Sequence, residues 1–356
     1  MKIKIHKKYI KDDLLSFITF ENKKDFEVIF CNYGASIYSI YMKNKFGNKE
    51  NIIMTPKNYS DFFDVEAYYG KTIGRTSGRI SEASFNIDGE KYELINNRDT
   101  DVVLHGGASK LSDMFYEYEI IEEVDKSYII FKGYSLDGAA GYPGTIDLKI
   151  VYTLYEENDE LLVEYFATTT KKTVLNLTNH AYFNLSGDFK RSVLEHNLLI
   201  KASRFVEIDD EMLPICIRSV NEVMDFRDGK IIEKDINDDY LQNHTAEGYD
   251  HPFIFDDQNY EICNVSLWDS TSGRQLDIYT TYPSVVVYSN NYPTFKEMID
   301  KESVDSKYDA ICLECQFIPN GINMNTDEDK GILDVDEKYY QKTKYSFKLK
   351  ENKYYE

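Results

Sequence analysis

His180 lies in a segment whose alternating side chains predict a β-strand with one apolar face and one polar face. The apolar positions are Leu175, Leu177, Ala181, Phe183 and Leu185, and the polar positions are Asn176, Thr178, His180, Tyr182 and Asn184. Only Asn179 interrupts the apolar face. An imidazole titrates near neutral pH, so on a face that meets a ligand it can transfer a proton. The alternative is a solvated outer face of a sheet, which an isolated histidine would favour.

Glu314 lies on the polar face of a second predicted strand. Its apolar face holds Ile311, Leu313, Cys315 and Phe317, and its other face holds Cys312, Glu314 and Gln316. Residues three apart in an extended strand are separated by roughly 10 Å, beyond the ~7 Å Cα separation that a disulfide tolerates. Cys312 and Cys315 are therefore predicted to have neither a redox nor a metal-binding role. Glu314 is expected to face away from the core, as His180 does.

Three further segments could carry chemistry. His105 precedes Gly106 and Gly107, which would let the backbone approach a ligand closely. Arg79 follows a glycine-rich stretch whose spacing matches neither a Walker loop nor a dinucleotide fingerprint. Asp250 lies in a predicted tight loop before a strand. Taken singly, these residues are as well explained by a buried histidine, a loop-bracing arginine and a solvated aspartate.

The elements that must position these residues are predicted to be almost all β-strands. Period-2 alternation and turn dipeptides such as Asp88-Gly89 and Pro143-Gly144 dominate, and helical periodicity is scarce. The pattern predicts an all-β fold, a large antiparallel β-sandwich with few short helices, in one domain over residues 1–356. The acidic segment from Val206 to Gly248 is expected to be a long loop region. The predicted strands are 26–31, 37–42, 115–121, 128–134, 145–155, 161–168, 196–202, 265–268, 274–282, 285–288 and 343–349.

Composition excludes several classes of partner. The formal net charge of −21 argues against nucleic acid and against an anionic membrane surface, since both select for basic patches. The chain has no apolar run long enough to span a bilayer and no evident export signal. Its five cysteines form no framework spacing, which fits a reducing cytoplasm. A neutral small molecule is the partner that remains compatible.

Taken together, the segments resemble the aldose 1-epimerase (galactose mutarotase) family. The resemblance runs from Gly34-Ala-Ser to Tyr345-Ser-Phe, and six motifs occur in the family's order. These motifs are Gly74-Arg-Thr-Ser-Gly-Arg-Ile80, Leu104-His-Gly-Gly107, Asp137 to Gly144, Asn176 to Gly187, Gly248-Tyr-Asp-His-Pro-Phe253 and Cys312-Leu-Glu-Cys-Gln316.

The resemblance implies a β-sandwich that interconverts the α and β anomers of a free hexose without a cofactor. Glu314 would be the general base at the anomeric hydroxyl, and His180 the general acid at the ring oxygen. His105, Asp250 and Arg79 match family positions that contact sugar oxygens. Replacing His180 by Asn or Glu314 by Gln is expected to abolish mutarotation with little effect on thermal stability. Because an unperturbed imidazole is mostly neutral at pH 7, nearby carboxylates are expected to raise the pKa of His180.

Some alternatives stay open at this point. A non-catalytic sugar-binding protein would keep the cleft but lose the acid or the base. A glycoside hydrolase could use Asp250 and Glu314 as its two carboxylates, and a hexose-phosphate mutarotase would need more cations than the matched residues supply. Many relatives carry asparagine in place of Gly78 and glutamine in place of Val286, so the preferred sugar is left open. The expected assembly is a monomer or a weak homodimer.

Overall fold

Antiparallel β-strands make up most of the regular structure in the computed structural model of the protein, which describes residues 1–10, 13–64, 66–96, 100–242 and 246–350. The described residues include two short α-helices, α1 (Tyr59–Asp64) and α2 (Asp239–Gln242). Single 3₁₀ turns occur at η1 (Ser81–Ala83), η2 (Leu111–Asp113), η3 (Ala139–Gly141), η4 (Val193–Glu195) and η5 (Ile232–Lys234). The predicted all-β class is therefore confirmed. None of the described helices has the length and apolar character needed to cross a membrane.

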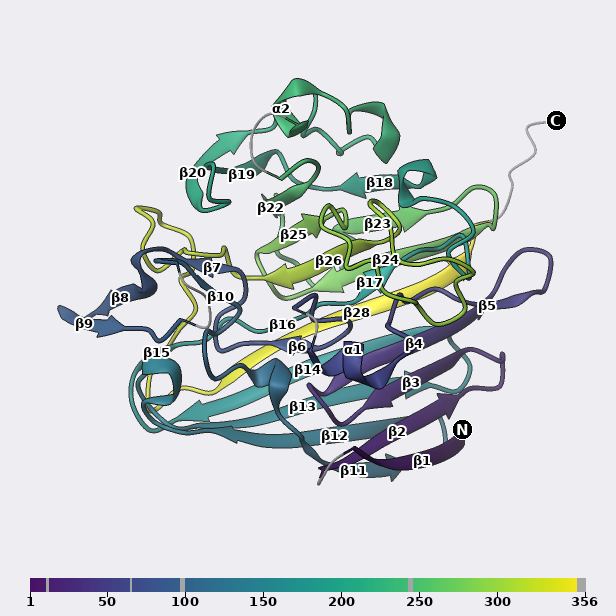
Figure 1. Cartoon of the computed structure of the whole chain (residues 1–356), viewed down its shortest axis with the longest axis horizontal. Coiled ribbons are helices and arrows are strands. Elements are labelled where there is room, and N and C mark those ends of the chain that lie inside the picture. The colour runs from purple at the N-terminus through teal and green to yellow at the C-terminus, as the bar shows by residue number, and fades with distance from the viewer. Residues whose placement is uncertain (11–12, 65, 97–99, 243–245, 351–356) are drawn as a thin grey trace.

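A nine-stranded sheet forms one layer of the sandwich (Figure 1). Its strands, in spatial order, are β11 (Glu117–Glu122), β12 (Lys126–Ser135), β13 (Ile146–Tyr155), β14 (Glu160–Thr169), β28 (Tyr339–Leu349), β24 (Arg274–Thr280), β23 (Val265–Trp268), β18 (Asn197–Ile200) and β21 (Lys230–Ile231). Along β14, buried residues alternate with partly exposed ones. This alternation is what a sheet with one face on the core and one face in water requires.

The other layer combines a five-stranded sheet and a six-stranded sheet. The five-stranded sheet contains β1 (Lys2–Ile10), β2 (Asp13–Glu21), β3 (Glu27–Cys31), β4 (Ser36–Lys43) and β5 (Lys49–Asn51). The six-stranded sheet contains, in spatial order, β17 (Tyr182–Phe183), β26 (Ile311–Gln316), β25 (Ser284–Tyr288), β22 (Asp250–Ile254), β19 (Arg204–Ile208) and β20 (Pro214–Ser219). In Figure 1 the N-terminal sheet lies below, and the six-stranded sheet rises from β17 toward β20 at the top.

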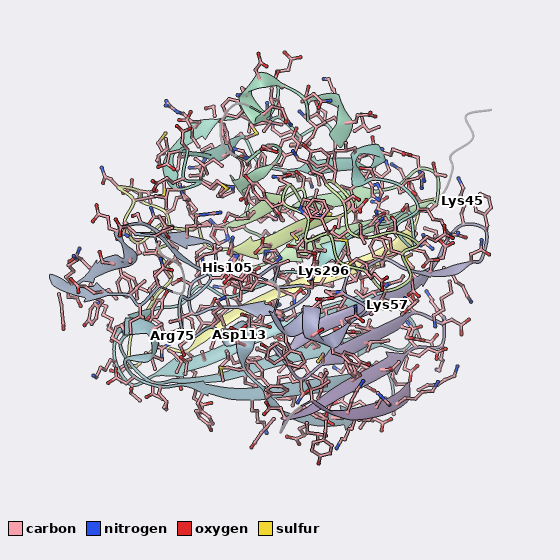
Figure 2. All side chains as sticks on the ribbon, viewed as in Figure 1. Lys45, Lys57, Arg75, His105, Asp113 and Lys296 are labelled. Carbon is pink, nitrogen blue, oxygen red and sulfur yellow. The ribbon has the colours of Figure 1, made fainter. Side chains whose placement is uncertain are left out.

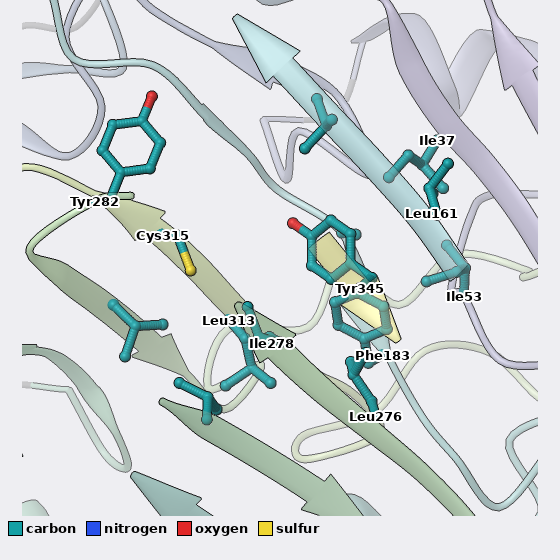
Figure 3. Packing of buried hydrophobic residues seen from close by; sticks show 14 of the residues in the cluster. Ile37, Ile53, Leu161, Phe183, Leu276, Ile278, Tyr282, Leu313, Cys315 and Tyr345 are labelled. Carbon is teal, nitrogen blue, oxygen red and sulfur yellow. The ribbon is translucent and has the colours of Figure 1, made fainter. Parts of the chain in front are cut away.

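The hydrophobic core fills the space between these layers. One cluster joins Phe20 of β2, Ile129 of β12, Leu313 of β26 and Tyr345 of β28. Figure 3 shows Leu313 and Cys315 projecting from one side of β26 into this cluster. The alternate side chains of β26, including Glu314, therefore project from the face opposite this cluster.

Four two-stranded ladders tie the connecting segments to the sandwich. They pair β6 (Thr72–Ile73) with β16 (Thr178–Asn179), β7 (Arg79–Ile80) with β10 (Val103–Leu104), β8 (Ser84–Ile87) with β9 (Glu90–Glu93), and β15 (Thr173–Val174) with β27 (Ile332–Leu333). The first two matter most for function, because they anchor the segments that carry His180, Arg79 and His105.

Two local predictions were wrong, and one hairpin was not predicted. The segment from Val206 to Gly248 is not a long loop, because most of β19 and the whole of β20, β21 and α2 fall within it; residues 243–245 lie outside the described chain. Its acidic residues concealed the short apolar stretches that pair. The hairpin of β1 and β2 was not predicted.

The second wrong prediction is the continuous strand around His180. The chain there forms two short strands, β16 and β17, which pair with different partners. The predicted alternation nevertheless holds, since all five apolar positions from Leu175 to Leu185 lie in the main core. Asn179 is accommodated on this side because its amide donates to the Gly70 carbonyl at 2.7 Å and to the Tyr152 hydroxyl at 3.2 Å.

Candidate active site

The pairing of β17 with β26 brings His180 to Glu314. Tyr182 lies opposite Cys312 in this antiparallel ladder, and continuing the same register by two residues sets His180 opposite Glu314. The two side chains meet, with His180 Nε2 3.4 Å from Glu314 Oε1. Both are almost completely buried, with exposed fractions of 5% and 3%. The solvated-face interpretation of His180 is therefore wrong.

The backbone of His180 is fixed at the point where the chain changes partners. Its N–H donates to the Lys71 carbonyl, and its carbonyl accepts from the Gly70 N–H, both at 2.9 Å. These bonds extend the β6–β16 ladder to His180, and β17 then pairs with β26. The main chain on either side of His180 is consequently fixed by two different ladders, which sets the direction in which the imidazole projects.

Asp250 reaches the same face through β25. Asp250 pairs with Tyr288, and Val286 of β25 pairs with Glu314 of β26. Because successive side chains alternate across a sheet, Asp250, Val286, Tyr288 and Glu314 all project from the face opposite the core. Asp250 is the first residue of β22. The sequence had predicted that it would lie in a loop before this strand.

Burial controls the protonation of the pair. It lowers the pKa of His180 to about 4 and raises the pKa of Glu314 well above its usual value, with the negative charge of Asp250 adding to the rise and Arg79 opposing it. A protonated Glu314 supplies no negative charge to retain a proton on the imidazole. The expectation that carboxylates raise the pKa of His180 is therefore wrong: the favoured state is a neutral imidazole beside a protonated carboxyl.

Arg79 stands beside Asp250 at the same cavity. Arg79 Nη1 lies 3.6 Å from Asp250 Oδ2, and Arg79 Nη2 donates to the sulfur of Met212 at 3.4 Å. Burial raises the pKa of Asp250, and the guanidinium opposes that rise. The pair presents both hydrogen-bond donors and acceptors to a ligand.

His105 is oriented by the backbone of the glycine-rich segment. The Gly78 N–H donates to His105 Nδ1 at 3.1 Å, and the His105 N–H donates to the Gly78 carbonyl at 3.0 Å. In a neutral imidazole the hydrogen is then on Nε2, which leaves that nitrogen as a donor. Figure 2 shows His105 near the centre of the molecule.

The glycines of this region serve backbone packing. A Cβ on Gly106 would lie 2.2 Å from the Gly74 carbonyl oxygen. Gly106 therefore permits close approach to protein backbone, whereas the sequence had predicted close approach to a ligand. Gly78 has φ +72°, and a Cβ there would lie 2.5 Å from Cβ of Pro319. This contact excludes any larger side chain at position 78 without movement of Pro319.

These side chains line one cavity of about 500 Å³, within the range of small-molecule sites. All five predicted site residues belong to its lining: Arg79, His105, His180, Asp250 and Glu314. Sequence reasoning placed Gln316 on the Glu314 face but did not select it as a site residue, and it missed Tyr68, Met212 and Tyr292. Within the described chain, Glu314 Oε2 and Gln316 Oε1 are buried without a hydrogen-bond partner. Buried polar atoms are normally satisfied, so both mark places where a ligand hydroxyl can donate.

Among the acidic and basic side chains of the cavity, carboxyl groups are the more numerous. Its described lining contains three carboxyl groups, those of Glu66, Asp250 and Glu314, and one guanidinium, that of Arg79. No group of three or more histidine, cysteine, aspartate or glutamate residues suited to a metal ion occurs in the described part of the chain. The polar side chains of the cavity and its His180–Glu314 pair can offer hydrogen bonds and proton transfer to a ligand.

The two-layer antiparallel fold and this acid–base cavity define a sandwich of the galactose mutarotase-like class. An aldose epimerase homologue from C. elegans superposes with a TM-score of 0.83 at 26% identity, over 94% of this chain and 99% of that one. A galactose 1-epimerase from Lactobacillus acidophilus NCFM superposes with a TM-score of 0.83 at 25% identity, over 98% of this chain and 99% of that one.

The aldose 1-epimerase family model matches residues 16–346. An aldose 1-epimerase from Haemophilus influenzae is 31% identical over 337 residues, covering 93% of this chain and 95% of the relative. A galactose mutarotase from Rattus norvegicus is 28% identical over 292 residues, 82% of each chain. The chain belongs to the aldose 1-epimerase family and is an isomerase that acts on carbohydrates.

Proposed function

We propose that the enzyme interconverts the α and β anomers of neutral free aldohexoses such as galactose or glucose. Glu314 acts as the general base on the anomeric hydroxyl, and His180 as the general acid on the ring oxygen. The observation that carries this proposal is the buried contact of 3.4 Å between His180 Nε2 and Glu314 Oε1 in the cavity. This contact places an acid and a base next to each other. Proton transfer at two neighbouring oxygens of a sugar, the ring oxygen and the anomeric oxygen, requires such an arrangement.

The pair works with one labile proton. Moving that proton from Glu314 to His180 Nε2 creates an ionised carboxylate and an imidazolium, without exchange with solvent. Glu314 then removes the proton of the anomeric hydroxyl while His180 protonates the ring oxygen, the bond between C1 and the ring oxygen breaks, and the aldehyde forms. The pair returns to its neutral state in this step. Because burial favours the neutral state, it makes His180 a stronger acid and Glu314 a stronger base.

Rotation about the C1–C2 bond presents the other face of the aldehyde. His180 then takes the hydroxyl proton of C5, the oxygen of C5 attacks C1, and Glu314 returns a proton to the carbonyl oxygen. The opposite anomer forms, and the pair again holds one proton. No oxidant, reductant or cofactor enters this balance.

Arg79, Asp250 and His105 hold the sugar during these transfers. The guanidinium and Nε2 of His105 donate to hydroxyl oxygens, and the Asp250 carboxyl accepts from hydroxyl groups. Gln316 Oε1 supplies a further acceptor. The described lining disfavours a hexose phosphate, since its one guanidinium, that of Arg79, already lies beside the Asp250 carboxyl. Membership of an isomerase family argues against the glycoside hydrolase alternative.

The test is polarimetry with freshly dissolved α-D-galactose and α-D-glucose, and a coupled anomer-specific assay with glucose 6-phosphate. We expect acceleration with the neutral sugars and little with the phosphate. The variants His180→Asn and Glu314→Gln should each lose about 10²–10⁴-fold in kcat, the usual contribution of positioned proton transfer. Wild-type rates in either variant, or a preference for the phosphorylated sugar, would contradict the proposal.

A further inference from the structure

Cys312 contacts the imidazole of His180 on the side away from Glu314. Its sulfur lies 3.5 Å from His180 Nδ1, while Nε2 lies 3.4 Å from Glu314 Oε1. Cys312 and Glu314 occupy alternate positions of β26 and so project from the same face. The imidazole is therefore contacted at both nitrogens by side chains of one strand.

The proton arrangement of the pair decides what this sulfur does. In the neutral pair, the carboxyl of Glu314 carries the labile proton and Nε2, 3.4 Å away, is the nitrogen that can accept it, so the single ring hydrogen of His180 is on Nδ1. In the ionised pair both nitrogens carry hydrogen. Nδ1 is thus a donor in either state, and the sulfur of Cys312 is the acceptor beside it. Burial raises the pKa of the Cys312 thiol well above its usual value, so the group stays a neutral thiol throughout.

Aromatic rings restrict the imidazole from its other sides. The rings of Tyr182 and His105 have centroids 5.1 Å and 5.4 Å from that of His180, and the Tyr68 centroid lies at 6.0 Å. Exchanging the positions of Nδ1 and Nε2 would need a ring flip inside this packing. The hydrogen bond to sulfur and the packing together favour one orientation.

We propose that Cys312 is a positioning residue, which accepts the Nδ1 hydrogen of His180 and reserves Nε2 for proton exchange with Glu314 and the sugar. Sulfur is a weak acceptor. The sulfur can therefore orient the ring. A carboxylate in the same place would also stabilise the imidazolium, which the sulfur does not. The effect of Cys312 on kcat rests on the proposed function, whereas the assignment of the His180 hydrogen to Nδ1 does not.

The test combines ¹⁵N NMR of the histidine rings with steady-state kinetics on Cys312→Ala and Cys312→Ser. His180→Asn identifies the His180 signals. Wild type and Cys312→Ser, whose hydroxyl can also accept, should show His180 protonated on Nδ1 at pH 7. Cys312→Ala should show mixed tautomers and a kcat lowered about two- to tenfold, the effect of one ordinary hydrogen bond, with KM unchanged.

Cys315 provides a matched control on the same strand. It is buried as Cys312 is, but it faces the hydrophobic core and not the imidazole. Cys315→Ala should lower the unfolding temperature and keep both the tautomer and kcat. An Nε2-protonated His180 in wild type, or an unchanged tautomer and kcat in Cys312→Ala, would overturn the role of Cys312. If wild type failed to interconvert anomers, the proposed function would fail, and the NMR result would still decide the tautomer.

Discussion

Replacing Glu314 by Gln tests the protonation of the active-site pair through folding stability, independently of turnover. The glutamine keeps the size of the side chain and removes its titration. Glu314 is 3% exposed, and its pKa lies well above the ordinary value of 4.5. The folded protein therefore keeps a proton on this carboxyl at pH values where the unfolded chain has released it.

The sign of the effect follows from proton linkage. Above pH 4.5 the folded state binds more protons at this site than the unfolded state, so the wild-type free energy of unfolding falls as pH rises toward the folded pKa. Each pH unit corresponds to about 1.4 kcal/mol. Between pH 5 and pH 7, the free energy of unfolding of Glu314→Gln should therefore gain on that of wild type by up to this amount for each unit of pH. The sequence-based expectation of unchanged stability is revised accordingly.

The assay is urea denaturation of both proteins at pH 5, 6 and 7, with Glu302→Gln as the same change at an exposed site. The difference between Glu314→Gln and wild type should grow steadily with pH, and that between Glu302→Gln and wild type should not. A pH-independent difference at Glu314 would show that the carboxyl has an ordinary pKa in the folded protein. It would refute the one-proton description of the pair.

Two further predictions concern turnover and binding. The pH–rate profile of kcat/KM should have an acid limb near pH 4, where His180 takes up a second proton, and an alkaline limb where the pair loses its only proton; a limb near pH 6.5 would indicate an unperturbed histidine instead. Gln316→Leu should raise KM for galactose by up to about tenfold, because a sugar hydroxyl loses its acceptor, and should not lower the free energy of unfolding, since Gln316 Oε1 is buried without a partner in the described chain. An unchanged KM would remove Gln316 from the sugar site.

Several features of the protein could be predicted from local sequence. Side-chain alternation separated the core face from the polar face around His180 and Glu314, because a strand places neighbours on opposite sides whatever it pairs with. The same parity predicted that Cys312 and Cys315 would remain apart, and both are free thiols. Six motifs in order identified the family and five of the residues that line the cavity.

The tertiary structure decided what those residues do to one another. The change of partner at His180, the register of β17 on β26 and the contact of Cys312 with Nδ1 depend on pairing between segments more than 100 residues apart in sequence. Burial in the folded protein moved the pKa of His180 downward, where local reasoning expected a rise. Proton affinity depends on solvation and on charges brought close by folding, and neither is encoded in the spacing of a motif.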